Sequence, residues 1–221
     1  MKSKIFRVIA TLAAFSTVGA ALTVQAQNLL VNGDLESTPA DVFYDGFDPS
    51  LADDVPGWNL FLGAADGSYV LVDGVGSGNT DVDMGNSPAG GGLETAALSR
   101  PAVIPGNSYT ATATYDNYFA PTDAYYFIDW YDGVGGLLGS DGGLLGDANG
   151  PFAYDPYGQI VTVAGIAPGS AATAGVRFTS GNFSYAGLAA DNFTLGAIPE
   201  PGTIALAMLG GCWALAAVRR R

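Results

Sequence analysis

Ser108-Tyr-Thr-Ala-Thr-Ala-Thr-Tyr115 is the stretch of the chain that decides the fold. Tyrosine and alanine alternate with threonine along it, so that Tyr109 and Tyr115 fall on one face and every threonine on the other. A period of two residues is typical of a half-buried β-strand. Pro105-Gly-Asn107, which stands just before it, supplies a turn. The stretch therefore predicts an antiparallel β protein.

The same alternation extends along the chain on both sides. In residues 125–131 it puts Asp129 on one face and the largest apolar side chains on the other, which we expect to be buried. In residues 172–179 it points Arg177 toward solvent, and residues 192–195 form the last strand. Weaker strand candidates are residues 29–31, 58–62, 69–72, 93–98 and 160–163. Eight or nine short strands predict an all-β, two-sheet antiparallel β-sandwich.

Both ends of the chain have the pattern of targeting segments. Lys2, Lys4 and Arg7 precede an apolar stretch, and Val24-Gln-Ala26 is a small-x-small cleavage site, so residues 1–26 are predicted to be a signal peptide. Residues 27–198 then form the body, a length that suits one domain.

The other end is a tail, residues 199–221, in which a Pro-Glu-Pro turn precedes an uncharged run and a closing arginine cluster. Sixteen helical residues span about 24 Å, somewhat less than a hydrocarbon core of about 30 Å, and arginines that snorkel close the difference. The tail therefore predicts a transmembrane helix whose arginines stay cytoplasmic. The residues of this signal are Pro199, Glu200, Pro201, Arg219, Arg220 and Arg221.

This tail resembles the PEP-CTERM sorting signal of exopolysaccharide-producing Gram-negative bacteria. The resemblance implies processing by an exosortase-type protease, a transient stay in the inner membrane, and then a place at the cell surface or in the extracellular matrix of a biofilm. Cys212-Trp213 stands where members more often have Leu, Gly or Ala, which leaves open a subfamily with a different processing enzyme.

The body is strongly acidic. Its two basic residues, Arg100 and Arg177, stand against twenty carboxylates, a formal charge of −18. Such a surface repels nucleic acid and strongly anionic glycans and favours metal cations or neutral ligands. A surface whose charge only keeps the protein soluble is the other interpretation. Since Cys212 is the only cysteine, the body has no disulfide, and its stability must come from the core or from bound metal.

Four short motifs in the body carry a second resemblance. They are Asn28-Leu-Leu-Val-Asn-Gly-Asp-Leu-Glu36, Pro105-Gly-Asn-Ser-Tyr109, Tyr131-Asp-Gly133 and Ala190-Asp-Asn-Phe-Thr-Leu195. In this order they resemble the galactose-binding-like jelly roll of many carbohydrate-binding modules, although Leu35 stands where the family usually has Phe. The resemblance implies a structural calcium ion that joins the first and last strands, at positions matched here by Glu36 and Asp191.

Two other acidic runs compete as calcium loops. Residues 81–86 begin like an EF-hand loop but lack its later ligands, and residues 135–147 contain a seven-residue glycine-rich duplication that we expect to be a surface loop.

The chain contains no histidine, which excludes Ser-His-Asp and Cys-His nucleophilic sites and histidine-ligated zinc. An enzyme would have to use carboxylates, but Glu36 and Glu94 are the only glutamates of the body. The protein is therefore predicted to be non-enzymatic, with a carboxylate-dependent glycosidase as an alternative.

Sugar binding needs an exposed aromatic ring beside hydrogen-bonding groups. Trp58 and Trp130 have the context of core residues. Rings set among Asp, Gly and Pro are the better ligand candidates, and these are Tyr44, Phe47, Tyr118, Phe119, Tyr154 and Tyr157. The sequence thus predicts a secreted, surface-sorted protein of the polysaccharide matrix that binds carbohydrate. A structural or adhesive surface protein without a glycan site is the other alternative.

Overall fold

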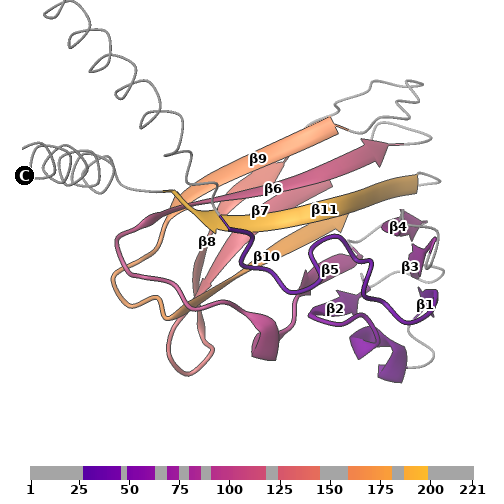
Figure 1. The fold of residues 1–221 in the computed structure, drawn as a ribbon, viewed down its shortest axis with the longest axis horizontal. Coiled ribbons are helices and arrows are strands. Elements are labelled where there is room, and N and C mark those ends of the chain that lie inside the picture. Colours follow the sequence, from indigo (N-terminus) through magenta and orange to yellow (C-terminus); the bar gives the residue numbers. More distant parts are fainter. Residues whose placement is uncertain are drawn as a thin grey trace, which may run out of the picture. The chain divides into compact units, whose positions relative to one another are not determined.

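The computed structural model describes residues 27–45, 49–62, 69–74, 80–85, 91–117, 124–144, 159–180 and 187–198 (Figure 1). Contacts group Gln27–Ala197 into one compact unit. The predicted signal peptide and sorting tail lie outside the described residues and stay predictions. In the part of the chain that the structure describes, no helix is long and apolar enough to cross a membrane.

Within these described residues, eleven strands form two sheets in which all neighbours are antiparallel. The order in the six-stranded sheet is β1 (Val42–Tyr44), β3 (Tyr69–Asp73), β4 (Asp81–Gly85), β11 (Gly187–Ala197), β6 (Ser108–Asn117) and β9 (Gln159–Ile166). The order in the five-stranded sheet is β2 (Trp58–Phe61), β5 (Gly92–Thr95), β10 (Thr173–Ser180), β7 (Ala124–Tyr131) and β8 (Leu137–Leu144). Two 3-10 helices, η1 (Pro49–Asp53) and η2 (Ala97–Ser99), complete the described elements.

The inner faces of the two sheets pack against each other through aromatic rings. Trp58 of the five-stranded sheet lies 5.0 Å, ring to ring, from Phe193 of the six-stranded sheet, and Tyr109 meets Trp130 edge-on at 5.7 Å. All four side chains are buried. Because large rings remove the most apolar area from water, these contacts dominate the core. The predicted all-β architecture with two antiparallel sheets is confirmed.

The strand predictions are confirmed where alternation is strongest. In β6 the alternating tyrosines and alanines are buried and the threonines between them are partly exposed, as expected for residues 108–115. In β7 the face that carries Tyr126, Ile128 and Trp130 is buried.

The prediction of a strand at residues 29–31 is wrong. Asn32 and Leu35 have φ of 51° and 56°, a left-handed conformation that turns the chain. The segment is held to β11 instead: the Leu29 N–H donates to the Leu195 carbonyl at 2.8 Å, and the Asn28 carboxamide donates to the Phe193 carbonyl at 3.0 Å.

Three of the described strands were not predicted, and the short strand β1 is one of them. Residues 81–86, weighed above as a poor calcium loop, contain β4, and most of the glycine-rich duplication, expected to be a surface loop, forms the edge strand β8.

Candidate functional site

The outer face of the five-stranded sheet carries a row of polar and aromatic side chains. Asn59 lies opposite Glu94, Glu94 opposite Arg177, and Arg177 opposite Phe127, so the row crosses β2, β5, β10 and β7. Residues directly opposite one another in antiparallel strands project from the same face. Their sequence neighbours, such as Trp58 and Leu93, are buried in the core, so this row faces outward.

Aromatic rings flank the row. Tyr125 and Phe127 follow each other at spacing two on β7, with ring centroids 6.2 Å apart and planes only 4° from parallel. Both are half-buried, so part of each ring is accessible. Phe61, on β2, lies across Gly92, where a Cβ would come within 3.0 Å of its Cζ atom. The glycine therefore leaves room for this third ring.

A buried carboxylate fixes the arginine of the row. Arg177 donates from Nε to Asp129 Oδ2 at 2.8 Å and from Nη2 to Oδ1 at 3.2 Å, and Ser140 donates to Oδ1 at 2.5 Å. Asp129 is 3% exposed. Arg177 was predicted to point to solvent, but its side chain is only 26% exposed, and its Cζ lies 4.3 Å from the Phe127 centroid. Chiefly because of the hydrogen bond to Asp129, the pKa of Arg177 is raised.

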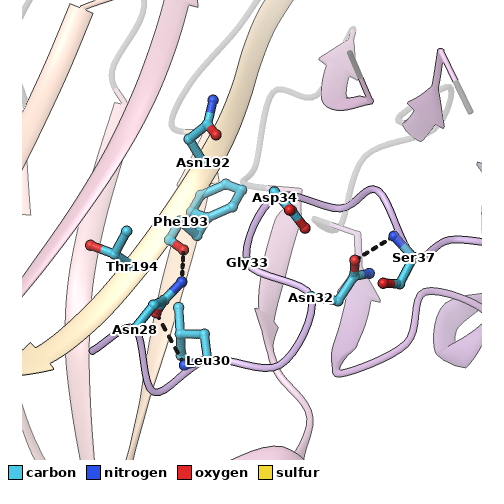
Figure 2. A pocket seen from close by; sticks show the side chains of 9 residues that line it. All are labelled: Asn28, Leu30, Asn32, Gly33, Asp34, Ser37, Asn192, Phe193 and Thr194. Atoms are coloured by element: carbon cyan, nitrogen blue, oxygen red, sulfur yellow. Dashed lines mark hydrogen bonds between the residues drawn. The ribbon is translucent and has the colours of Figure 1, made fainter. Parts of the chain in front are cut away.

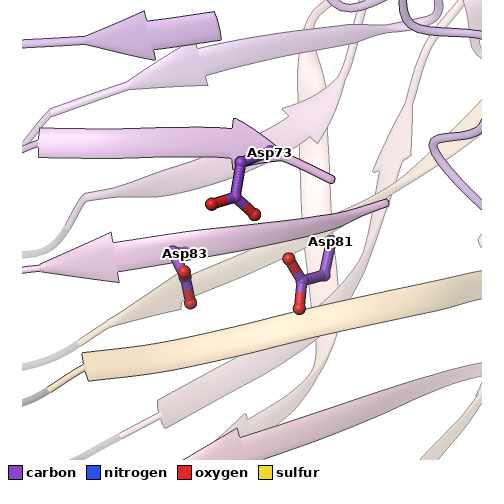
Figure 3. Close-up of side chains that lie close together, drawn as sticks. All are labelled: Asp73, Asp81 and Asp83. Carbon is purple, nitrogen blue, oxygen red and sulfur yellow. The ribbon is translucent and has the colours of Figure 1, made fainter. Parts of the chain in front are cut away.

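The outer face of the six-stranded sheet carries an acidic cluster, Asp73, Asp81 and Asp83 (Figure 3). Asp73 lies opposite Asp81 on β3 and β4, and Asp83 follows at spacing two. One carboxylate oxygen from each residue lies within 4.8 Å of the others, and such a group can hold a metal ion.

The cluster strongly disfavours negative charge. Burial raises the pKa of Asp81 to about 7, helped by the charge of Asp83 and by the hydrogen bond and charge of Asp73. Burial and the charge of Asp73 raise the pKa of Asp83 to about 6. A bound cation would relieve this repulsion.

The predicted calcium ligands lie beside this cluster. The pKa of Asp191 is raised to about 6 by burial, by Glu36 and by Asp34, and Asp191 in turn raises the pKa of Asp81. Glu36 accepts a hydrogen bond from the Thr80 N–H at 2.7 Å. The charge of Glu36 therefore acts on Asp191. The ligand role itself stays a prediction.

The cluster residues were missed as a site because they were considered as part of a loop. In Asp81-Val-Asp83 the alternation around a buried valine was the available signal, since it places both carboxylates on one face of a strand.

A pocket of about 310 Å³ lies between the N-terminal segment and β11 (Figure 2). Its amide side chains are already engaged. Asn28 accepts from the Leu195 N–H at 3.1 Å, and Asn32 accepts from the Ser37 N–H at 2.7 Å and donates to the Pro56 carbonyl at 3.2 Å. Asn28 thus holds the segment on β11 and Asn32 holds the turn within it, so these amides have structural roles and the pocket is a weaker ligand site than the outer face of the five-stranded sheet.

Of the predicted ligand-binding rings, only Tyr44 belongs to the described residues. It is half-buried and packs against the core. The others, Phe47, Tyr118, Phe119, Tyr154 and Tyr157, lie outside the described residues. Trp58 and Trp130 are core residues, as expected. Tyr125 and Phe127 were missed as ligand candidates, although alternation placed them on the outward face of their strand.

No protein-family model matches the chain, and no curated protein sequence matches it. Among solved structures it is similar to the enzymatically active domain of tailspike protein 4 of bacteriophage CBA120, with a TM-score of 0.53 and 16% identity. The match covers 77% of this chain and 21% of the tailspike chain, so the protein spans about a fifth of its length. A family 16 carbohydrate-binding module (TM-score 0.46, 16% identity) and a CBM4 structure (0.47, 12%) are each matched over 99% of their length and 76% of this chain. Those two scores are too low to support an argument. The tailspike match shows a shared fold.

Proposed function

We propose that the protein is a secreted, non-enzymatic protein of the extracellular polysaccharide matrix, and that it binds a glycan on the outer face of its five-stranded sheet. The observation that carries the proposal is the row of Asn59, Glu94 and Arg177 beside the near-parallel rings of Tyr125 and Phe127.

The chemistry of this row suits a sugar. The C–H face of a pyranose packs on an aromatic ring, and its hydroxyl groups bond to planar polar groups beside the ring. An amide, a carboxylate and a guanidinium provide both donors and acceptors. Since Arg177 is held by Asp129 and lies on Phe127, it loses little conformational freedom when a ligand binds.

The buried carboxylate of this face is not available for hydrolysis. Asp129 is occupied by two N–H groups of Arg177 and the Ser140 hydroxyl. On the other sheet, the raised pKa of Asp81 would suit a general acid, but its cluster has carboxylate oxygens within 4.8 Å. The three carboxylates can together hold a cation, and we propose a structural calcium ion there or at Glu36 and Asp191.

The sorting part of the proposal rests on the two ends of the chain. A signal peptide at residues 1–26 would export the body, and the Pro199-Glu-Pro201 tail would hold it in the inner membrane until an exosortase-type protease releases it. The surface or the matrix would then be its final location.

Affinity electrophoresis of the full-length protein through gels that contain glucan, xylan or mannan tests the glycan site. Phe127→Ala should abolish most of the retardation, whereas Phe43→Ala should not. Phe43 is the matched control because it is 50% exposed and stacks on Tyr69 at 5.4 Å on the other sheet. Reducing-end assays run alongside: new reducing ends would support the glycosidase. An absence of retardation in every gel would favour the structural or adhesive alternative.

A further inference from the structure

The two basic residues of the body lie on the same outer face, each against an aromatic ring. Arg177 lies over Phe127, and the Cζ atom of Arg100 lies 3.5 Å from the ring centroid of Tyr131. In a body with twenty carboxylates, the only two guanidinium groups are therefore gathered beside the proposed glycan site.

Arg100 reaches this face across a glycine. Ala102 bridges Thr173, and the Ala174 N–H donates to the Pro101 carbonyl at 3.1 Å, so Arg100 comes beside Gly175 at the start of β10. A Cβ at Gly175 would lie 3.6 Å from the Cγ atom of Arg100. This is an ordinary van der Waals distance, so the side chain passes in contact with Gly175 of β10, and its guanidinium stacks on Tyr131 of β7.

The two arginines differ in their partners. Arg177 is neutralised by the bidentate contact with Asp129, which is the only ion pair found among the described residues. The Nε atom of Arg100 is buried and has no hydrogen-bond partner there. Because this atom is covered, a ligand would have to approach Arg100 from its Nη atoms, and no ion pair among the described residues holds this guanidinium.

Stacking on the ring defines which ligand suits Arg100. A guanidinium packed face-on against an aromatic ring keeps its N–H edge free, and this planar fork matches the two oxygens of a carboxylate. The formal charge of −18 opposes a densely charged polymer, so the matching ligand is a mainly neutral glycan that carries separate carboxylates.

We propose that Arg100 makes this face prefer glycans that carry a uronic acid, whose carboxylate it binds while the sugar chain lies on Tyr125 and Phe127. This inference rests on the proposed glycan site and specifies its ligand class. A bidentate, charge-assisted contact should strengthen binding about tenfold, which corresponds to about 1.4 kcal/mol.

The test compares one polymer in two forms. Full-length protein is titrated with glucuronoxylan and with the same glucuronoxylan after its carboxylates have been reduced to alcohols by carbodiimide and borohydride. The intact polymer should bind about tenfold more tightly, and the preference should weaken as salt screens the contact. In Arg100→Gln the two affinities should become equal.

Arg100→Lys keeps the charge but lacks the planar fork, so it should retain only part of the preference. If Arg100→Gln melts at a lower temperature than the parent protein, Arg100→Lys is the variant that tests the inference. Equal binding of both polymers by the parent protein, or a tenfold preference that survives in both variants, overturns the inference while the glycan site stands. Binding of neither polymer, together with no retardation in the glucan, xylan and mannan gels, overturns the proposed site and the inference with it.

Discussion

The Asp129 carboxylate is the charged group that orders the outer face of the five-stranded sheet. It is buried, holds Arg177 through two hydrogen bonds, and accepts a third from Ser140. Loss of one partner of a buried pair leaves the other without compensation, and usually costs more than the pair itself contributes.

Asp129→Ala should therefore lower the free energy of unfolding by about 2–3 kcal/mol, somewhat below the usual range because Arg177 is 26% exposed. Urea denaturation of the purified protein measures this change. Asp53→Ala, at an exposed position of η1, is the control and should change the value by less than about 0.5 kcal/mol. Equal midpoints for the two variants would mean that the contact contributes nothing.

Three carboxylates on β4 and the neighbouring β11 should make the stability of the folded protein depend on pH. The pKa values of Asp81, Asp83 and Asp191 lie near 7, 6 and 6, above the ordinary value of 3.8. The folded state then binds more protons than the unfolded state between about pH 4 and 7, so stability rises as the pH falls.

In EDTA, the melting temperature should therefore be higher at pH 5 than at pH 8, apart from opposing contributions of other groups. Asp83→Asn should raise the melting temperature at pH 8 and flatten the pH dependence, because it removes one of the repelling charges. Thermal melts across this pH range check both. If the melting temperature of Asp83→Asn depended on pH as steeply as that of the parent protein, the raised pKa of Asp83 would be contradicted.

Calcium should stabilise the folded protein at these carboxylates, as protons do, and should compete with protons for them. A hundredfold excess of calcium over its Kd would stabilise the folded protein by about 2.7 kcal/mol, provided that the unfolded chain does not bind it. Melting in EDTA and then in millimolar Ca²⁺ measures the effect, and Glu36→Ala and Asp191→Ala should each remove most of it. If only Asp83→Ala removes the calcium effect, the ion is bound at the cluster of Asp73, Asp81 and Asp83 instead. Equal melting temperatures in EDTA and in Ca²⁺ would mean that these carboxylates bind no calcium.

The alternation of apolar and polar residues predicted some of these strands and missed others. β6 was predictable because its alternation coincides with burial, and β7 because only one of its faces is fully apolar. β8 was not, because it is itself rich in glycine and carries no apolar alternation, so its place beside β7 depends on backbone pairing.

The candidate site was harder to predict from the sequence than the strands were. Asn59, Glu94, Arg177 and Phe127 are far apart in the chain, and only the register of three strand pairs brings them into one row. Arg100 lies outside the named strands, and only the fold brings it onto Tyr131.

At the scale of the whole chain, we predict that both end segments are removed during export and sorting. Because both have the pattern of targeting segments, the protein exported by its own host should lack the residues before Gln27 and those after the Pro199-Glu-Pro201 turn. Intact-mass measurement of the exported protein decides this. A mature species that still ends in Arg221 would refute the sorting proposal.

The position of β11 has a consequence for how the chain acquires its structure. This last strand lies between β4 and β6, and its Leu195 N–H bonds to the side chain of Asn28, 167 residues earlier. While the chain is synthesised, β4 and β6 therefore lack the strand that lies between them, and the opening segment lacks its bonds to β11 until residues 187–197 emerge. Such long-range closure makes folding slow and leaves strand edges unpaired for longer. The domain should remain open to chaperones, and able to pass a translocation channel, until nearly its full length is available.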